Sequence, residues 1–259
     1  MIFPIGDQNV KGGHYPFVTY TFIVLNIIFF LIQLSVAGNL ICAFASIPSQ
    51  IAQGKDLFTL ISSMFLHGGW MHLIGNMLFL WVFADNIEAI IGNLMFFLFY
   101  VGGGIIAAFA HIFLSIGGPE AIVDCCTICA SAIPANCGSL QPCVGAVPTV
   151  GASGAISAVL GAYFIMFPGS QIKVLFFIKT FTISALLFLG FWIAQQLFSG
   201  FTSLGAGATS SGVAWWAHIG GFVFGVLMGF LFKQWFPKID LIKRAAPLGP
   251  QYKSRNRGF

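Results

Sequence analysis

Six long apolar stretches constrain this chain more than any other feature, because each is long enough to cross a lipid bilayer. They lie at about 17–38, 70–91, 94–116, 151–168, 174–198 and 213–236. A helical span needs roughly 20 mostly apolar residues, and only 7% of this chain is charged, against about 25% in a typical soluble domain. The stretches are too long and too unalternating for barrel strands. The sequence therefore predicts an all-α membrane protein, a six-helix bundle with a long first loop at about 39–69.

The two ends of the chain differ from this apolar domain. We expect residues 1–16 to form an N-terminal segment, 17–236 the membrane domain and 237–259 a basic tail. Lys55 alone falls on one side of the membrane, and nine basic residues fall on the other: Lys11, Lys173, Lys233, Lys238, Lys243, Arg244, Lys253, Arg255 and Arg257. Because Lys and Arg in short loops mark the cytoplasmic side, both termini are predicted to be cytoplasmic.

The surroundings of the protein follow from the same composition. The basic tail is interpreted as a contact with the lipid surface, not as a nucleic-acid arm. The first residues do not resemble a cleavable signal peptide. We expect the lipid bilayer of a prokaryotic plasma membrane, with an organelle as the open alternative.

Polar side chains occur near the start of three of the apolar stretches. Ser153 begins the fourth stretch and His218 lies near the start of the sixth. His72 and Asn76 open the second stretch at a spacing that places both on one helix face. These three stretches start on the same side of the membrane, so the four side chains reach a similar depth. Because polar groups at membrane depth are costly, the agreement indicates a working site.

A serine and a histidine that meet in lipid can act as a nucleophile and its base. Serine is a weak nucleophile until a base removes its proton, so Ser153 is the candidate nucleophile and His218 the candidate base. Acyl transfer also needs donors for the oxyanion. The candidates are His72, Asn76, Gly151 and the backbone N–H of Ser153.

A third catalytic residue is not evident. All seven carboxylates are interpreted as lying outside the spans, with Asp85 and Glu88 in a cytoplasmic turn. Packing or backbone is therefore expected to orient His218, which gives a Ser-His dyad and no Ser-His-Asp arrangement. The sequence also lacks a His-Glu-x-x-His motif and a pair of intramembrane aspartates. We expect no cofactor and no catalytic metal.

Small residues are expected to hold the site together. Gly154 follows Ser153 directly, and Gly221 and Gly225 follow His218 at a spacing of four residues. Such residues allow membrane helices to pack closely. The sixth helix is therefore predicted to lie tight against the fourth, so that His218 reaches Ser153.

The third loop, 117–150, is rich in cysteine and is predicted to lie outside. It contains Cys125, Cys126, Cys129, Cys137 and Cys143, while Cys42 follows the first span. An external compartment is oxidising in many cells, so we favour disulfides, without choosing a pairing. A zinc site formed by Cys125 or Cys126 with Cys129, Cys137 and Cys143, and free thiols, are the alternatives.

Three motifs resemble those of rhomboid proteases. The run from Ser62 to Asn76 resembles the second helix of that family, with its His-x-x-x-Asn motif. Gly151 to Gly154 matches Gly-x-Ser-Gly, and Ala217 to Gly221 matches Ala-His-x-x-Gly. The motifs occur in family order, and the resemblance covers roughly residues 14–236.

This resemblance implies an intramembrane serine endopeptidase that cleaves transmembrane segments of other membrane proteins. It implies that Ser153 and His218 form the dyad and that His72, Asn76 and the backbone around Ser153 form the oxyanion hole. It also implies a lateral gate and cap in Phe191 to Phe201 and the loop up to Gly212. Ser157 stands where some relatives carry a tyrosine that stacks on the catalytic histidine.

The alternative function is a catalytically inactive relative that binds membrane clients. It is disfavoured because both Ser153 and His218 are present. A transporter or channel is disfavoured because no intramembrane carboxylate suggests an ion path. The natural substrate and the oligomeric state cannot be inferred from the sequence.

Overall fold

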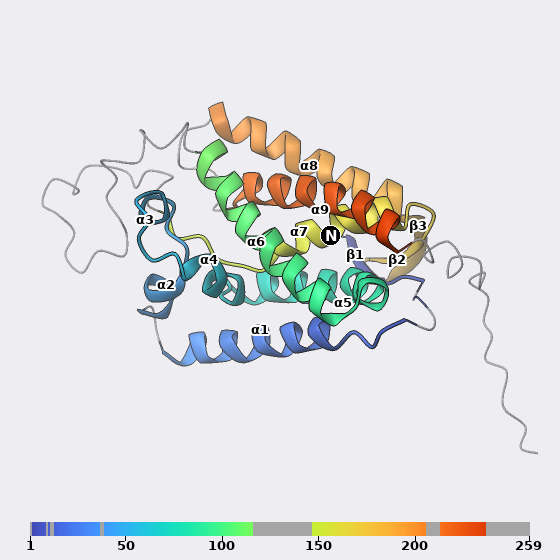
Figure 1. Ribbon diagram of the computed structural model, residues 1–259, viewed down its shortest axis with the longest axis horizontal. Helices are drawn as coiled ribbons and strands as arrows, with labels where there is room; N and C mark the ends of the chain where they lie inside the picture. Colours follow the sequence, from blue (N-terminus) through green and yellow to red (C-terminus); the bar gives the residue numbers. More distant parts are fainter. Residues whose placement is uncertain are drawn as a thin grey trace, which may run out of the picture.

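The computed structural model describes residues 2–8, 10, 13–36, 39–115, 147–205 and 213–236, and in this part the chain folds as a helical bundle (Figure 1). The main helices are α1 (Phe17–Ser35), α5 (Trp70–Ile91), α6 (Asn93–Ser115), α7 (Ser153–Met166), α8 (Ala185–Gly205) and α9 (Trp215–Trp235). Five of these helices are long and apolar enough to cross a membrane, and α7, with 14 residues, is a shorter apolar helix. The prediction of an all-α membrane bundle is confirmed, and the protein is an integral membrane protein.

The short helix α7 lies at the centre of the bundle, packed against α5, α6 and α9 (Figure 1). Its side chains are buried without interruption from Ala155 to Tyr163. A Cβ on Gly161 would collide with the backbone carbonyl of Phe222 on α9, and a Cβ on Gly225 of α9 would collide with that of Ala158. A helix that is apolar on every face belongs in an interior, so α7 does not need the length of a lipid-facing span.

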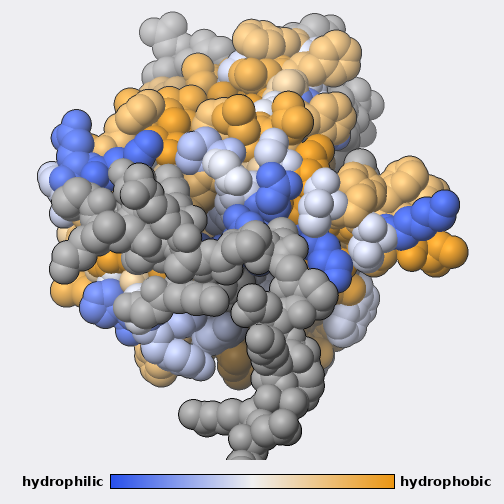
Figure 2. Space-filling view, turned by 90° about the vertical axis from the view of Figure 1, so that its right-hand side faces the viewer, coloured by the Kyte–Doolittle hydropathy of each residue, from blue (hydrophilic) through white to orange (hydrophobic). Residues whose placement is uncertain are grey.

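The two ends of the bundle are built differently (Figure 1). At one end, called here the site end, the first loop folds into α2 (Asn39–Phe44), α3 (Pro48–Ala52), α4 (Thr59–Ser62) and the 3-10 helix η1 (Ser63–Phe65). At the other, the sheet end, β1 (Ile2–Gly6), β2 (Gln171–Phe176) and β3 (Lys179–Ser184) form an antiparallel sheet in the order β1-β2-β3. Seen from the sheet end, hydrophilic residues lie in an interrupted band across the view, and apolar residues dominate the part above it (Figure 2).

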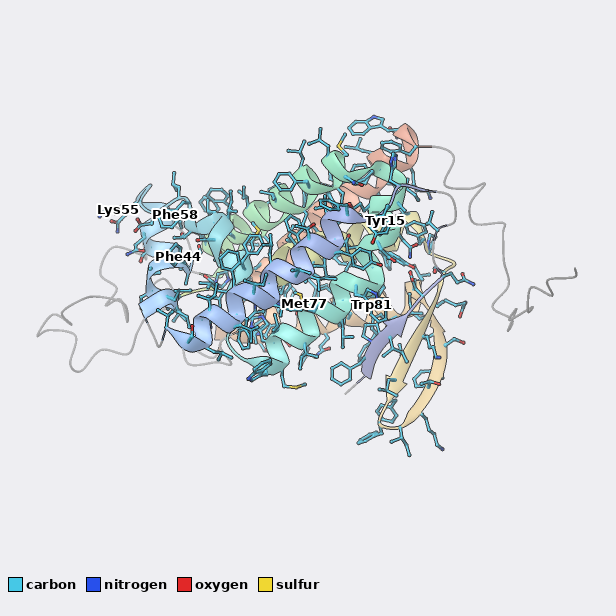
Figure 3. All side chains as sticks on the ribbon, turned by 90° about the horizontal axis from the view of Figure 1, so that it is seen from below. Tyr15, Phe44, Lys55, Phe58, Met77 and Trp81 are labelled. Atoms are coloured by element: carbon cyan, nitrogen blue, oxygen red, sulfur yellow. The ribbon has the colours of Figure 1, made fainter. Side chains whose placement is uncertain are left out.

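The predicted fifth span, 174–198, is wrong at its start. Residues 174–184 belong to the β2–β3 hairpin and its turn, and α8 begins only at Ala185. β-branched and aromatic residues dominate this segment and favour strands, and Phe177 in the turn has a φ of 53°. The hairpin projects sideways from the end of the bundle (Figure 3). A short apolar run does not by itself distinguish strand from helix, and here the strand preference prevails.

The interpretation of Asp85 and Glu88 as turn residues is also wrong. Helix α5 continues through both residues to Ile91, and both carboxylates are buried. Glu88 accepts hydrogen bonds from the backbone N–H groups of Val18 and Thr19, both at 2.7 Å, and from the Thr19 hydroxyl at 2.6 Å. A carboxylate at these unpaired amides satisfies the N-terminus of α1 and favours its dipole. Glu88 therefore fastens the start of α1 to α5.

Asp7 attaches the N-terminal segment to the same end of the bundle. Its carboxylate accepts a hydrogen bond from the Asn86 side chain at 2.6 Å and another from the Tyr163 hydroxyl. Burial is the main cause that raises the pKa of Asp7 to about 7, and the nearby Asp85 raises it further. The described residues of the predicted segment 1–16 thus pack on the membrane domain through β1 and Asp7. The predicted tail, 237–259, lies outside the described residues.

Candidate active site

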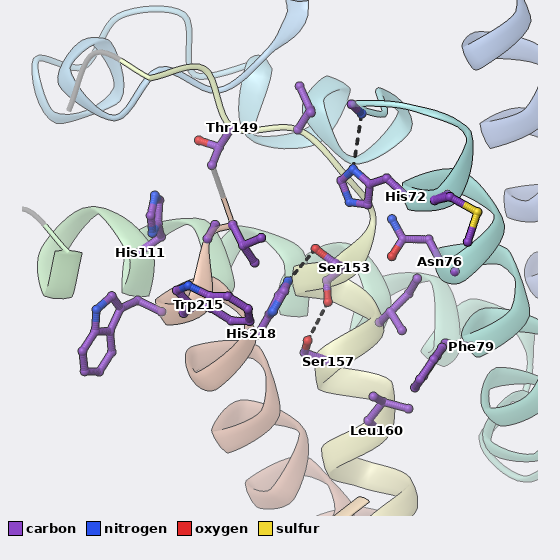
Figure 4. A pocket seen from close by; sticks show the side chains of 18 of the residues that line it. His72, Asn76, Phe79, His111, Thr149, Ser153, Ser157, Leu160, Trp215 and His218 are labelled. Carbon is purple, nitrogen blue, oxygen red and sulfur yellow. Dashed lines mark hydrogen bonds between the residues drawn. The ribbon is translucent and has the colours of Figure 1, made fainter. Parts of the chain in front are cut away.

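Ser153 and His218 meet at the site end. Ser153 is the first residue of α7 and His218 lies in the first turn of α9. His218 Nε2 is 2.8 Å from Ser153 Oγ, although the two residues are far apart in the chain (Figure 4). This distance allows the hydroxyl proton to pass directly to the imidazole.

Helix α8 supplies two side chains that hold the His218 ring. Gln196 Oε1 is 2.8 Å from His218 Nδ1, and the ring of Trp192 lies 6.0 Å from the imidazole, centroid to centroid. The expectation that packing or backbone alone orients His218 is therefore incomplete. Gln196 was missed because a single glutamine matches no motif. The available signal was its polarity within an apolar stretch, since such groups tend to be functional.

Ser157 does not take over the contact with the catalytic histidine that a tyrosine at this position is expected to make in some relatives. Its hydroxyl donates a hydrogen bond of 2.6 Å to the backbone carbonyl of Ser153, one turn earlier on α7 (Figure 4). The aromatic contact with His218 comes instead from Trp192 and from Trp215, whose ring centroid lies 6.2 Å away.

His72 presents a donor towards the backbone that precedes Ser153. Its Nδ1 accepts a hydrogen bond of 3.3 Å from the Gly68 backbone N–H (Figure 4). A neutral imidazole has one donor and one acceptor nitrogen, so the proton is on Nε2. A Cβ on Gly151 would come within 2.7 Å of this Nε2, which places the donor beside the segment that leads into Ser153.

Asn76 lies one turn further along α5 and is oriented by a second histidine. Its side-chain nitrogen is 3.0 Å from Nε2 of His67. The backbone of His67 is itself paired with the Gln33 side chain on α1, at 2.6 and 3.1 Å. The amide has two protons, and only one can point at His67. The second N–H remains for a ligand in the cavity that Asn76 lines.

Gly151 provides space beside His72 and does not provide a donor for the oxyanion. Its φ of 121° lies in a region that side chains disfavour, and the ring of His72 occupies the place of a Cβ. Its backbone N–H donates to the Ser63 carbonyl at 2.9 Å and is therefore not available to an oxyanion. The backbone N–H of Ser153, in the first turn of α7, has no intrahelical acceptor.

The first loop holds the segment before Ser153 in place. Ser46 and Thr149 form two backbone hydrogen bonds, at 2.8 and 3.1 Å, and the Thr149 hydroxyl donates to the Ser46 carbonyl at 2.7 Å. Together with the bond from Gly151 to Ser63, these contacts fix the entry to α7. The long first loop thus positions the candidate nucleophile.

The glycines near the site lie where helices approach closely. A Cβ on Gly154 would come within 2.7 Å of the Ala107 side chain on α6. A Cβ on Gly221 would collide with the Gly154 carbonyl, and Gly225 lies equally close to Ala158. The backbones of α7 and α9 therefore touch directly below the Ser153–His218 pair.

A cavity of about 740 Å³ surrounds the pair. Its polar lining includes His72, Asn76, Ser153 and His218, and its apolar lining includes Met71, Phe79, Leu160, Trp192 and Trp215. Helices α5 and α8 touch through Phe79, Phe83 and Phe188, and the cavity extends from this contact towards the site end. Apolar side chains therefore lie next to Ser153 in the cavity.

The cysteine predictions fall mostly outside the described residues. Cys42 lies in α2 and is disulfide-bonded. Cys125, Cys126, Cys129, Cys137 and Cys143 are not described, so disulfides in their loop and the alternative zinc site stay predictions. In the described part of the chain, no group of three or more His, Cys, Asp or Glu side chains is placed to hold a metal ion.

The fold and the Ser153–His218 pair define a helical membrane protein with a polar site at one end of its bundle. The family model of the Rhomboid domain matches residues 54–235, well over half of the chain. The chain belongs to the rhomboid family. It is also similar to "Rhomboid protein 1, mitochondrial" of Saccharomyces cerevisiae, with 28% identity over 180 residues. That match covers 68% of this chain and 43% of the yeast protein, so the chain spans less than half of that relative.

Proposed function

We propose that this chain is an intramembrane serine endopeptidase that cleaves transmembrane segments of other membrane proteins. The observation that carries the proposal is the 2.8 Å contact between Ser153 Oγ and His218 Nε2 inside the cavity. Membership of the rhomboid family supports protease activity of the intramembrane type.

The geometry supports an acyl-transfer mechanism. His218 Nε2 takes the hydroxyl proton while Ser153 Oγ attacks the scissile carbonyl, and the imidazolium then returns that proton to the leaving amine. Water, deprotonated by the same nitrogen, hydrolyses the acyl-enzyme and regenerates Ser153. His72 Nε2–H, the free amide N–H of Asn76 and the Ser153 backbone N–H stabilise the oxyanion.

The cavity favours a transmembrane segment as the substrate. Its apolar lining suits side chains that come from lipid, and the polar groups lie at one end, around Ser153. A segment that enters between α5 and α8, above their phenylalanine contact, meets the serine near its own end. Cleavage near the edge of the membrane follows from the position of Ser153 at the start of α7.

The charge distribution supports an orientation with the sheet end in the cytoplasm. Lys173, Lys179 and Lys233 belong to the sheet end, and Lys55 lies in the first loop at the site end. An excess of basic residues marks the cytoplasmic side. We assign both termini to the cytoplasm and the membrane to a prokaryotic plasma membrane. Protease protection of tags at either terminus, in sealed vesicles of known orientation, tests the assignment.

The activity is tested with a fluorescent fluorophosphonate probe, which forms a covalent bond with activated serines. The detergent-solubilised wild type is expected to label, and both Ser153→Ala and His218→Ala are expected to lose labelling by at least about 10²-fold. Ser157→Ala is the matched control because it removes a hydroxyl one turn away on the same helix, and it is expected to label. Cleavage of a membrane-tethered substrate in vesicles then follows the same pattern.

Two outcomes would redirect the assignment. A folded wild type that never labels and never cleaves would favour the inactive relative that binds membrane clients. Labelling that persists in Ser153→Ala but disappears in Ser157→Ala would show that the nucleophile is wrongly assigned.

A further inference from the structure

The candidate base is held by a helix that carries neither member of the dyad. His218 is on α9 and Ser153 on α7, but the polar partner of His218 Nδ1 is Gln196 on α8. Gln196 is 4% exposed although α8 turns most of its surface outwards. Burying a glutamine among apolar helices is costly unless its polar atoms are paired, and the partner here is the imidazole.

The atom that faces His218 decides which imidazole nitrogen carries the proton. Gln196 approaches with its oxygen, Oε1, which can only accept a hydrogen bond. Nδ1 must therefore carry the proton, and Nε2 presents a lone pair to the Ser153 hydroxyl. This tautomer is the one in which His218 can act as a base towards Ser153.

Helix α8 also fixes the plane of the ring. Trp192 and Gln196 are one helical turn apart and lie on the same face of α8, and both contact His218. The opposite face carries Phe191 and Phe198, which are 71% and 72% exposed. The position of α8 relative to α9 therefore sets both the orientation and the tautomer of the imidazole.

We propose that Gln196 is a positioning residue that couples the location of α8 to the competence of the base. When α8 packs on α9, the Gln196 oxygen accepts the Nδ1 proton and leaves Nε2 free for Ser153. When α8 moves outwards to widen the cavity between α5 and α8, the acceptor withdraws, and the tautomer is no longer fixed. Catalysis then requires α8 to return after a substrate has entered. This inference rests on the proposed endopeptidase function for its consequence, but the tautomer itself can be measured without activity.

The first test is nitrogen NMR of the full chain labelled with ¹⁵N-histidine in detergent micelles. The chain has five histidines, and His218→Ala identifies the signals of His218. The wild type is expected to show a protonated Nδ1 and an unprotonated Nε2. Gln196→Met keeps the length of the side chain and removes the acceptor, so it is expected to shift both signals towards a mixture of tautomers. A wild type with the proton on Nε2 would overturn the proposal, and this result is read from the wild type, with His218→Ala used only to assign the signals.

The second test measures the rate of fluorophosphonate labelling. Gln196→Met is expected to label about tenfold to hundredfold more slowly, less than the 10²–10⁴ associated with general-base catalysis as a whole. Gln195→Met is the matched control because Gln195 is the preceding residue on α8 and is exposed. It is expected to match the wild type in labelling rate and in the His218 signals.

The two proposals fail in different ways. If the wild type labels, and Gln196→Met changes neither the labelling rate nor the His218 signals, the positioning role is wrong and the protease assignment stands. If Gln196→Met labels slowly with unchanged His218 signals, Gln196 acts through packing, which also overturns the positioning role. If the wild type does not label but Gln196→Met shifts the His218 signals, the positioning role stands and the protease assignment fails.

Discussion

Polar clusters lie at both ends of helices α5 and α7, and the two clusters differ in whether they contain carboxylates. At the site end, His72 and Asn76 of α5 lie near Ser153 of α7, around a cavity. At the sheet end, Asn86 of α5 lies near Tyr163 of α7, and both bond to the carboxylate of Asp7. The same pair of helices therefore supports a cluster of uncharged groups at one end and a cluster with carboxylates at the other.

The clusters differ in what their hydrogen-bonding groups do. At the sheet end, each carboxylate oxygen of Glu88 accepts from α1, and both polar atoms of the Asn86 side chain are used, by Val10 and Asp7. At the site end, the Asn76 amide, His72 Nε2 and the Ser153 backbone N–H keep donors that face the cavity. Donors left unpaired can serve a reaction, whereas saturated groups hold elements together. We therefore expect substitutions at the sheet end to reduce stability and those at the site end to reduce activity.

The largest effect on stability is expected from Glu88→Ala. The substitution leaves the buried backbone N–H of Thr19, the partly buried one of Val18 and the Thr19 hydroxyl without their acceptor. Hydrogen bonds to a charged group contribute roughly 1.5–3 kcal/mol each. We expect a loss of at least about 3 kcal/mol in the free energy of unfolding, measured by denaturant titration in detergent. Glu88→Gln, which keeps an acceptor oxygen, is expected to lose less. Equal losses in both variants would mean that the acceptors are not the cause.

A matched pair of asparagines on α5 tests the comparison directly. Asn76→Ala removes one oxyanion donor and is expected to lower turnover about 10²–10³-fold with a stability loss of about 1 kcal/mol. Asn86→Ala, ten residues further along the same helix, is expected to destabilise the protein and to leave turnover of the folded fraction unchanged. Turnover of a membrane-tethered substrate and the unfolding midpoint are measured on the same preparations. A drop in turnover for Asn86→Ala alone would reverse the assignment of the two ends.

The site end could be predicted from the sequence much better than the sheet end. Ser153 and His218 are chemically unusual residues for an apolar stretch, and their positions at the starts of spans already implied a common depth. Asp85 and Glu88 were misplaced because carboxylates near the end of an apolar run look like a loop, and the partners of Glu88 on α1 are distant in sequence. The hairpin was missed because its residues are as apolar as a span. Gln196 could not be assigned because its role depends on how α8 packs on α9.

The smallest effect is expected from the titration of Asp7. Burial raises the pKa of Asp7 from 3.8 to about 7, so the folded protein binds this proton more tightly than the unfolded chain does. The stability that this proton contributes is present below about pH 4 and is lost as the pH rises to about 7. Asp7→Asn preserves the shape of the side chain and removes its titration. Relative to the variant, the wild type is therefore expected to lose stability between pH 4 and pH 7.

The unfolding midpoint of both proteins across this pH range tests the assignment to Asp7. The carboxyl of Asp85 lies close to that of Asp7, so a slope that remains in Asp7→Asn is assigned to Asp85. Parallel curves for the two proteins would mean that Asp7 does not titrate in the window. Fluorophosphonate labelling, measured well below the unfolding midpoint, is expected to have the same pH dependence in both proteins, because the Asp7 cluster lies at the far end of α7 from Ser153. A change in that dependence would show that the two clusters communicate along α7, and the division between a stabilising end and a reactive end would no longer hold.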